Sequence, residues 1–166
     1  AEQHVLAANG AHGVLTCAIR PHVIFGPGDN RFMPALLDKA YGGRLRFGVG
    51  REQKLSDYTY ISNLVDALLL AEEQLTPEGS APGQAYFITN GEPMPFFDFV
   101  DLVLERIGMP KIRGMLPGSL MYAVAAVAEF YDTLKGGTLN AEDGLTRFAI
   151  RYMCTHHYFS IDKARR

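Results

Sequence analysis

The stretch VLTCAIRPHVIFGPGDN, residues 14–30, decides the fold, because an apolar run ends there in a glycine-rich loop. Residues 14–20 are apolar and β-prone, which predicts a buried strand of a parallel sheet that ends before Pro21. Open α/β sheets bind ligands just beyond the carboxyl ends of their strands, so this loop is a candidate ligand site. The alternative is a tight strand-to-helix turn that binds nothing.

The loop suits close contact between its backbone and a ligand. Pro21 has no N–H group, and we expect the amides of His22, Val23 and Ile24 to have no partner once the strand has ended. The glycines that follow let the backbone approach a ligand closely.

Strands and helices alternate along the rest of the chain. Asn30 is placed at the cap of a helix that ends at Gly42 and Gly43. Further strands are predicted over 45–50, 57–61 and 84–89, and further helices over 1–9, 62–75, 96–107, 117–135 and 141–151. This alternation predicts an α/β fold that becomes mostly helical after Pro110.

Apolar periodicity predicts which helix faces point inward. The predicted inward residues are Leu64, Val65, Leu68, Leu69 and Leu75 in helix 62–75, and Phe96, Phe99, Val100, Val103 and Ile107 in helix 96–107. The apolar core of helix 117–135, Leu120 to Ala128, falls short of the ~20 residues that a membrane-spanning helix needs. We expect a buried or lid helix there, with a peripheral membrane contact as the alternative.

Composition excludes several classes of protein. The 166 residues are 48% hydrophobic and 20% charged, as in a globular protein. A net charge of −2 with mixed signs argues against nucleic-acid binding. Cys17 and Cys154 stand far apart, which predicts a reducing, cytoplasmic location and no disulfide framework. The chain opens without an initiator Met, inside a predicted helix, so we expect it to be part of a longer protein.

Two other groups of reactive residues are weak candidates. Tyr131 and Lys135 form a Tyr-x-x-x-Lys pair on one helix face, but two fixed positions in five arise often by chance. Cys154, His156 and His157 have no second pair of ligands with which to hold a metal. We predict neither a catalytic nor a metal site at these positions.

Three stretches of the sequence resemble one enzyme family. They are TCAIRPHVIFGPGDNRFMPALL (16–37), DYTYISNLVDALLLAEEQL (57–75) and GQAYFITNGEPMPFFDFVDLVLERIG (83–108). They resemble the 3β-hydroxysteroid dehydrogenases, and among these most of all the bacterial steroid dehydrogenases and the sterol-4α-carboxylate 3-dehydrogenases. These enzymes belong to the extended short-chain dehydrogenase/reductase group. The closing HHYFSIDKARR (156–166) is similar to a late segment of the same family.

The resemblance implies the carboxy-terminal part of a Rossmann-like fold with a mostly helical substrate domain. Residues 1–30 would hold the end of the catalytic helix, a late Rossmann strand and the loop on the nicotinamide side. Residues 31–110 would form a mixed α/β substrate domain with the remaining sheet elements. Residues 111–166 would form a helical substrate or lid region.

The family chemistry is hydride transfer between a sterol C3 hydroxyl and NAD, followed in some members by C4 decarboxylation or Δ5–Δ4 isomerisation. The resemblance places the catalytic Tyr and Lys, and the Gly-rich turn that cradles the pyrophosphate, upstream of Ala1. No Gly-x-Gly-x-x-Gly occurs in this chain. We therefore expect the 166 residues alone neither to bind NAD tightly nor to turn over.

By position, the resemblance assigns nicotinamide contacts to Pro21, Val23 and Ile24. It assigns substrate contacts to four residues that follow: Asp29, Phe32, Met33 and Tyr58.

Three neighbouring residues are expected to support the site and to take no part in the chemistry. Arg20 would tie the strand end to a nearby carboxylate. Asp57 and Tyr60 are the first and last residues of the D-Y-T-Y segment, which the resemblance places near the cofactor.

Two other functions compete with a steroid dehydrogenase. One is an extended short-chain reductase or epimerase for a sugar nucleotide, although the pocket segments lack the basic residues that a diphosphate favours. The other is a non-catalytic lipid-binding module. The family also implies a homodimer through the catalytic helix. The sequence leaves the choice between NAD and NADP open.

Overall fold

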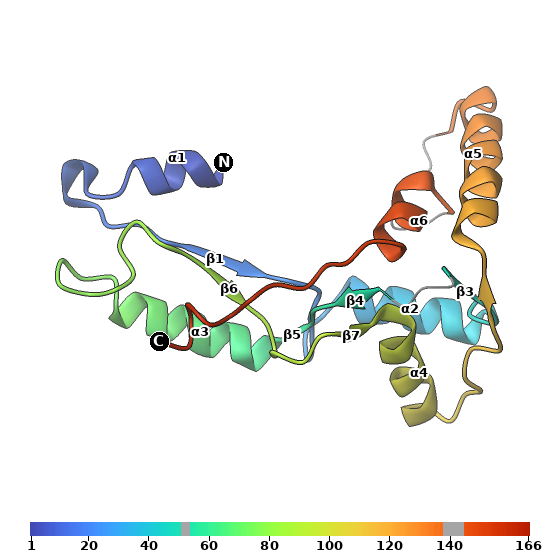
Figure 1. The fold of residues 1–166 in the computed structure, drawn as a ribbon, viewed down its shortest axis with the longest axis horizontal. Helices are drawn as coiled ribbons and strands as arrows, with labels where there is room; N and C mark the ends of the chain where they lie inside the picture. Colours follow the sequence, from blue (N-terminus) through green and yellow to red (C-terminus); the bar gives the residue numbers. More distant parts are fainter. Residues whose placement is uncertain (51–53, 138–144) are drawn as a thin grey trace. The chain divides into compact units, whose positions relative to one another are not determined.

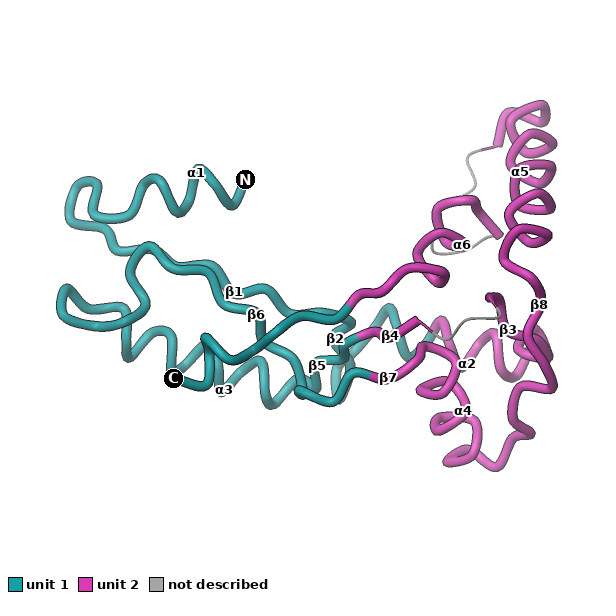
Figure 2. The backbone as a smooth tube through the Cα atoms, viewed as in Figure 1, with its two compact units in different colours: residues 1–34, 57–93, 158–166 teal, residues 35–56, 94–157 magenta. Residues whose placement is uncertain are grey.

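The computed structural model describes residues 1–50, 54–137 and 145–166, and these form two compact units (Figure 2). Each unit draws on segments that are far apart in the sequence. Unit 1 consists of Ala1–Pro34, Asp57–Pro93 and Tyr158–Arg166, and unit 2 of Ala35–Ser56 and Met94–His157. The predicted division into 1–30, 31–110 and 111–166 stays a prediction.

Unit 1 is built on two parallel strand pairs (Figure 1). Strand β1 (Ala18–Pro21) pairs with β6 (Ala85–Ile88), and β2 (Ile24–Phe25) pairs with β5 (Thr59–Tyr60). Helix α3 (Ile61–Glu73) follows β5 directly and contacts both β5 and β6. At the amino end, α1 (Glu2–Ala7) contacts β1 and leads into the 3₁₀ turn η1 (Ala11–Gly13).

Strand β1 is shorter than the predicted strand 14–20 and is shifted along the chain. Its pairing begins at Ala18, whose amide donates to the Gln84 carbonyl at 2.9 Å. It includes Pro21, which is tolerated as the last residue because no later ladder bond needs its N–H.

Unit 2 combines helices with two short strand pairs. Its helices are α2 (Phe32–Tyr41, which begins in unit 1), α4 (Phe96–Arg106), α5 (Gly118–Leu134) and α6 (Arg147–Met153). Strand β3 (Gly48–Val49) runs parallel to β8 (Met115–Leu116), and β4 (Leu55–Ser56) runs antiparallel to β7 (Met94–Pro95). The buried hydrophobic residues of this unit are Leu36, Ala40, Phe99, Val100, Leu104, Ala125 and Ile150.

The predicted inward face is buried in α4 but exposed in α3. In α4, Phe99 and Val100 are buried as expected. In α3 the prediction is wrong, because Val65, Leu68 and Leu69 are between 45% and 54% exposed. The reason is geometric: α3 contacts β5 and β6, and no described residue covers the side on which these three lie.

Helix α5 also departs from its prediction. Only Ala125 of its residues is buried, so a buried helix is excluded and the expected lid helix stays a prediction. No helix in the described ranges is long and apolar enough to cross a membrane. The predicted helix 141–151 appears as α6, and residues 141–144 lie outside the described residues.

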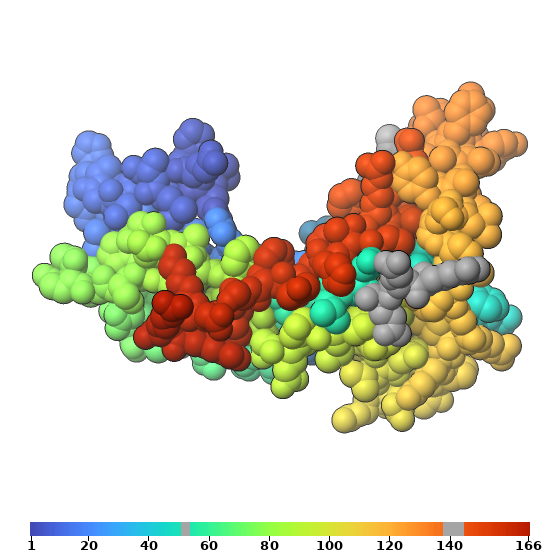
Figure 3. Space-filling view, viewed as in Figure 1, coloured from blue at the N-terminus to red at the C-terminus, as the bar shows by residue number. Residues whose placement is uncertain are grey.

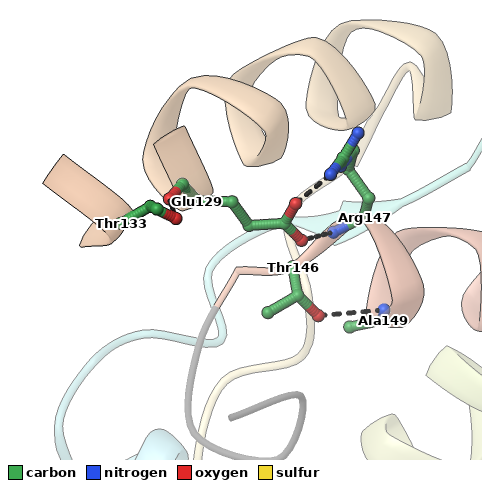
Figure 4. A network of polar contacts seen from close by, with 5 residues as sticks. All are labelled: Glu129, Thr133, Thr146, Arg147 and Ala149. Atoms are coloured by element: carbon green, nitrogen blue, oxygen red, sulfur yellow. Dashed lines mark hydrogen bonds and ion pairs between the residues drawn. The ribbon is translucent and has the colours of Figure 1, made fainter. Parts of the chain in front are cut away.

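Helices α5 and α6 are tied together by one carboxylate (Figure 4). Glu129 accepts hydrogen bonds from the backbone N–H of Arg147 at 2.7 Å and from its Nε at 2.5 Å. These two bonds hold the pKa of Glu129 below its usual value. Thr146 caps α6 by accepting the Ala149 amide at 3.1 Å.

Candidate cofactor-side loop

The loop between β1 and β2 is bent through an unusual backbone conformation. Val23 has φ +40°, in the left-handed region that β-branched residues rarely adopt. Such a conformation costs about 1–2 kcal/mol for a residue with a Cβ. It persists only where surrounding contacts hold it in place.

Thr59 supplies several of those contacts. Its Oγ1 accepts the His22 amide at 3.0 Å and lies 2.9 Å from the carbonyl oxygens of both His22 and Ile88, so its proton serves one or the other. Its own amide donates to the Val23 carbonyl at 3.2 Å. Thr59 is completely buried. This single side chain therefore joins the loop to the carboxyl end of β6.

The structure corrects the expectation that the His22 amide has no partner. Strand β5, which pairs with β2, carries Thr59, and the hydroxyl of Thr59 accepts the His22 amide although the two residues are 37 positions apart. Sequence reasoning missed Thr59, although one signal was available. Thr59 stands between two tyrosines in a segment predicted to be extended, a position typical of a buried strand residue, and a buried hydroxyl needs a hydrogen-bond partner.

A second polar residue, Asn90, fixes the end of β5. Its Oδ1 accepts the Tyr60 amide at 2.8 Å and the Asn63 Nδ2 at 2.9 Å. Its own amide donates to the Tyr58 carbonyl at 2.8 Å. The segments that follow β1 and β6 are thus both bonded to β5. Sequence reasoning missed this role as well.

The loop also passes close to the start of α3. Gly26 has φ +139°, and a Cβ at this position would lie 2.6 Å from the Ile61 Cγ2 atom. Phe25 contacts the Tyr60 ring edge-on, with centroids 5.4 Å apart. A larger residue at position 26 would force the loop and α3 apart.

The three predicted nicotinamide residues lie together at this corner. Pro21 ends β1, Val23 forms the bend and Ile24 begins β2. The Ile24 side chain is 40% exposed and offers an apolar surface. The corner lies beyond the carboxyl end of a parallel strand pair, where ligands of open α/β sheets bind.

Of the predicted substrate residues, Asp29 has a clear local role. Its carboxylate accepts the amides of Arg31, Phe32 and Met33 at 2.8–3.0 Å. Burial alone would raise the pKa of Asp29, but the three N–H donors together bring it below its usual value. Asp29, and not the predicted Asn30, therefore caps α2.

The other predicted substrate residues differ in exposure. Phe32 and Met33 are half-buried in the first turn of α2, whereas Tyr58 is only 3% exposed. Contact of these residues with a substrate stays a prediction.

The predicted contact of Arg20 with a nearby carboxylate is confirmed. Arg20 forms an ion pair with Glu2 of α1, with Nε 2.7 Å from Oε2, and its guanidinium lies 5.0 Å from the centre of the Phe87 ring. Glu2 thereby anchors α1 to β1. The resemblance to one family was sufficient to predict this contact, but not which carboxylate would make it.

Asp57 anchors the last segment of the chain. It is 1% exposed, and its Oδ2 accepts the Phe159 amide at 2.7 Å. The Phe159 ring stacks on Phe87 with centroids 4.3 Å apart and planes 3° apart. Further along, the Lys163 Nζ donates to the Ala85 carbonyl at 3.0 Å. Residues 158–166 thus pack back along β6.

The weaker candidates all lie in unit 2. His156 Nδ1 accepts the Leu55 amide at 3.1 Å, and the His157 Nε2 lies 3.1 Å from the Tyr152 carbonyl. Across residues 1–50, 54–137 and 145–166, no three His, Cys, Asp or Glu side chains gather as a metal site would require. Lys135 lies over the exposed Tyr131 ring at 5.1 Å.

Comparison with known proteins identifies the family. Residues 1–117 match the 3-beta hydroxysteroid dehydrogenase/isomerase family. The chain belongs to this family. Dehydrogenase chemistry is therefore the chemistry of its relatives, in agreement with the predicted resemblance.

Curated relatives match over the whole chain. It is 41% identical over 167 residues to a 2-alkyl-3-oxoalkanoate reductase of Stenotrophomonas maltophilia, covering all of this chain and 49% of that protein. It is 40% identical to a 3β-hydroxysteroid dehydrogenase/Δ5→4-isomerase of Mycobacterium tuberculosis, covering 100% of this chain and 44% of the relative. A decarboxylating sterol-4α-carboxylate 3-dehydrogenase of Mus musculus is 32% identical, with coverages of 99% and 46%. The chain spans about half the length of these relatives.

Solved structures support the predicted fold. The crystal structure of gox2253 matches with a TM-score of 0.66 at 22% identity, over 99% of this chain and 46% of the other. A dTDP-glucose 4,6-dehydratase of Bacillus anthracis, solved in complex with NAD, matches with a TM-score of 0.52 at 16% identity, over 69% and 36%. The chain therefore has the fold of the matching part of these two proteins, as expected for part of a Rossmann-like α/β fold.

Proposed function

We propose that this protein oxidises the 3β-hydroxyl of a steroid or sterol to a ketone with NAD, and that the loop 21–25 holds the nicotinamide end of the cofactor. Membership of the 3β-hydroxysteroid dehydrogenase family and relatives with steroid- and sterol-dehydrogenase names support the reaction. The position of the loop beyond the carboxyl end of β1 supports the cofactor assignment.

The exposed apolar side chain of the loop fits the flat face of an aromatic ring such as nicotinamide. Bound NAD would supply the hydride acceptor at its nicotinamide ring. The exposed side chain of Ile24 would cover one face of that ring, and the backbone of Pro21 and Val23 would meet its carboxamide. These residues position the ring and exclude water, and they exchange no proton.

The observation that carries the proposal is the strained Val23 held by the buried Thr59. A glycine at position 23 would adopt the left-handed conformation without strain, and a turn that binds no ligand has no need of a valine there. A strained residue held in place by buried hydrogen bonds is typical of pre-organised binding sites. The geometry of the loop is therefore fixed before the cofactor arrives.

A 4-carboxysterol substrate would add a second step. Oxidation at C3 places a ketone β to the carboxylate. The bond between C4 and the carboxylate then breaks, CO₂ leaves, and the electron pair passes into an enol that takes up a proton at C4. Phe32 and Met33 in the first turn of α2 would provide apolar contacts for such a substrate.

The relative named as a 2-alkyl-3-oxoalkanoate reductase favours a second candidate function. Reduction of a 3-oxo acid is the same hydride transfer in the opposite direction, on an acyclic chain that also carries a carboxylate. The loop assignment is common to both functions.

The deciding experiment is an assay of the purified full-length protein in both directions. NADH formation is followed with a 3β-hydroxysteroid and with a 4α-carboxysterol, and NADH or NADPH consumption with a 2-alkyl-3-oxoalkanoate. We expect sterol-dependent NADH formation. Turnover of the oxoalkanoate alone would replace the proposal by the second function, and turnover of none of the three would contradict both.

A pair of variants tests the role of the loop within that assay. Thr59→Val removes the hydroxyl that holds His22, and we expect kcat/KM for NAD to fall by about tenfold, equivalent to about 1.4 kcal/mol. Thr59→Ser keeps the hydroxyl and should stay within about threefold of wild type. Equal effects of the two substitutions would show that the hydroxyl does not hold the cofactor loop.

A further inference from the structure

The side chain of His22 takes part in a closed set of contacts between three distant segments of unit 1. The His22 Nδ1 atom lies 2.8 Å from the backbone carbonyl oxygen of Asp57. The Asp57 carboxylate accepts the Phe159 amide at 2.7 Å, and the Phe159 ring lies beside the His22 ring with centroids 5.7 Å apart. Asp57 therefore binds the loop with its carbonyl and the last segment of the chain with its carboxylate, and the two residues that it binds contact each other.

These contacts fix the imidazole next to the strained residue of the loop. A carbonyl oxygen only accepts hydrogen bonds, so the His22 Nδ1 atom carries a proton and donates it to Asp57. The His22 backbone is held separately, because its amide donates to the Thr59 hydroxyl at 3.0 Å. Val23, with φ +40°, follows directly in the chain. The strained residue thus follows one that is held both at its amide and at its ring.

The Phe159 ring is itself supported by the paired strands. It stacks on Phe87 of β6, with centroids 4.3 Å apart and planes 3° apart. Phe87 is the register partner of Arg20 in β1, and the Arg20 guanidinium lies 5.0 Å from the centre of the Phe87 ring. Phe159 therefore connects the strand pair β1–β6 to the side chain of a loop residue.

The segment that carries Phe159 lies at the surface of the protein. The space-filling view shows the last residues of the chain, in red, at the surface (Figure 3). Phe159 is 37% exposed, although it makes the contacts just described. The same segment has a second attachment near the other end of β6, where the Lys163 Nζ donates to Gln84 Oε1 at 2.8 Å and to the Ala85 carbonyl at 3.0 Å. The two attachments can therefore be removed one at a time.

We propose that Phe159 is a positioning residue for the cofactor, which acts through the His22 ring to hold loop 21–25 in the conformation that receives the nicotinamide end of NAD. This inference rests on the proposed function, which assigns NAD to that loop. Without the Phe159 ring, the loop keeps its bonds to Thr59 and Asp57 but loses one of its supports. The binding conformation is then less populated, and the dissociation constant for the cofactor rises by the same factor.

The first test measures the loop in the full-length protein without cofactor. Phe159→Ala removes the ring but keeps the amide that Asp57 binds. We expect hydrogen exchange over residues 22–25 to become about tenfold faster, because the loop opens more often. Far-UV circular dichroism checks that the variant is folded, and Phe159→Leu takes its place if it is not.

The matched control loosens the same segment at its other attachment. Lys163→Ala removes the bonds to Gln84 and Ala85 and leaves the contacts between Phe159 and His22 in place. Its exchange over residues 22–25 should stay within about twofold of wild type. Phe159→Tyr keeps an aromatic ring at the position and should recover most of the wild-type protection.

The second test measures the affinity for the cofactor in the same proteins. Titration followed by NADH fluorescence should give a dissociation constant about tenfold higher for Phe159→Ala than for wild type and Lys163→Ala. At saturating cofactor, kcat should change by less than about twofold, because the bound cofactor selects the same loop conformation. A residue that only supports the fold would not produce this separation of binding from turnover.

A double-mutant cycle tests whether Phe159 acts through His22. His22→Ala removes both the Nδ1 donor and the ring that Phe159 contacts. In that background, Phe159→Ala should change the dissociation constant for NADH by less than about twofold. Effects of the two substitutions that add in full would contradict an action through His22.

Two further results would overturn the proposal. The first is an equal change in loop exchange for Phe159→Ala and Lys163→Ala, because the whole segment and not the ring would then hold the loop. The second is faster exchange in Phe159→Ala with unchanged affinity for NADH. A wild type that does not bind NADH would contradict the proposed function instead, and the exchange measurement without cofactor would still decide whether Phe159 holds the loop.

Discussion

The corner formed by residues 21–25 and Thr59 in unit 1 contrasts with the apolar face of helix α5 in unit 2, where Leu120, Val124 and Val127 are exposed. In the corner, strained backbone is held by hydrogen bonds to a completely buried hydroxyl. In α5, the side chains are regular but the apolar face has no cover among the described residues. The corner is therefore fixed by contacts within unit 1, whereas the apolar face of α5 is exposed among the described residues.

The two regions also differ in how much stability the protein loses when one interaction is removed. Buried polar groups lose much when a partner is removed, because water cannot replace it. Exposed ion pairs lose little, because water and salt screen them. Substitutions in the corner should therefore have larger effects than substitutions at the α5–α6 contact.

The largest effect is expected at the hub of the corner. Thr59→Val should destabilise the protein by about 3 kcal/mol, because the His22 amide loses its buried acceptor and one of the two carbonyls, of His22 or of Ile88, loses the hydroxyl proton. Urea unfolding of the full-length protein measures this, with Thr59→Ser as control at about 1 kcal/mol for the lost methyl group. A loss of the same size in both variants would mean that packing, and not the hydroxyl, holds the corner.

The next effect concerns the segment that packs along β6. Asp57→Ala should cost about 2 kcal/mol, because the buried carboxylate is the acceptor for the Phe159 amide. Hydrogen exchange should become faster over residues 158–166, while α5 stays protected. Asp57→Asn keeps an acceptor oxygen and should show less of the change. Unchanged exchange in 158–166 for Asp57→Ala would contradict this anchoring role.

A smaller effect is expected where the loop enters α2. Asp29→Ala removes the cap and should cost about 1 kcal/mol at neutral pH. The folded-state pKa of Asp29 is lowered, so its contribution is present above the usual carboxylate pKa and is lost as the pH falls through the folded-state value. Thermal unfolding of wild type and variant should therefore converge in acid. A stability difference that does not change with pH would argue against a charged cap.

The smallest effect is expected at the contact between α5 and α6. Glu129→Gln keeps one acceptor for the Arg147 amide and removes a partly exposed ion pair. The shift in thermal midpoint should be the smallest of the four and should shrink further in high salt. A shift as large as that of Thr59→Val would remove the contrast between the two regions.

Parts of this structure could be predicted because they depend on local pattern. The helical period placed Phe99 and Val100 of α4 in the core, and the end of an apolar strand located the candidate loop. The same period failed for α3, because it says which residues share a face and not whether that face is covered.

The details of the loop could not be predicted because they depend on distant residues. Thr59 reaches His22 only through the pairing of β2 with β5, which no local pattern specifies. The choice of Asp29 over Asn30 as the cap depends on the first turn of α2, since both residue types cap helices well.

The central claim is that the loop at Pro21, Val23 and Ile24 contacts the nicotinamide end of NAD. The most direct measurement is a nuclear Overhauser experiment on the full-length protein with methyl-labelled isoleucine and bound NAD. Ile24→Val confirms the assignment of the Ile24 methyl signal. We expect a cross-peak between the nicotinamide ring protons and the Ile24 methyl group, because this side chain is 40% exposed at the corner. Nicotinamide cross-peaks to other isoleucines, with none to Ile24, would contradict the account.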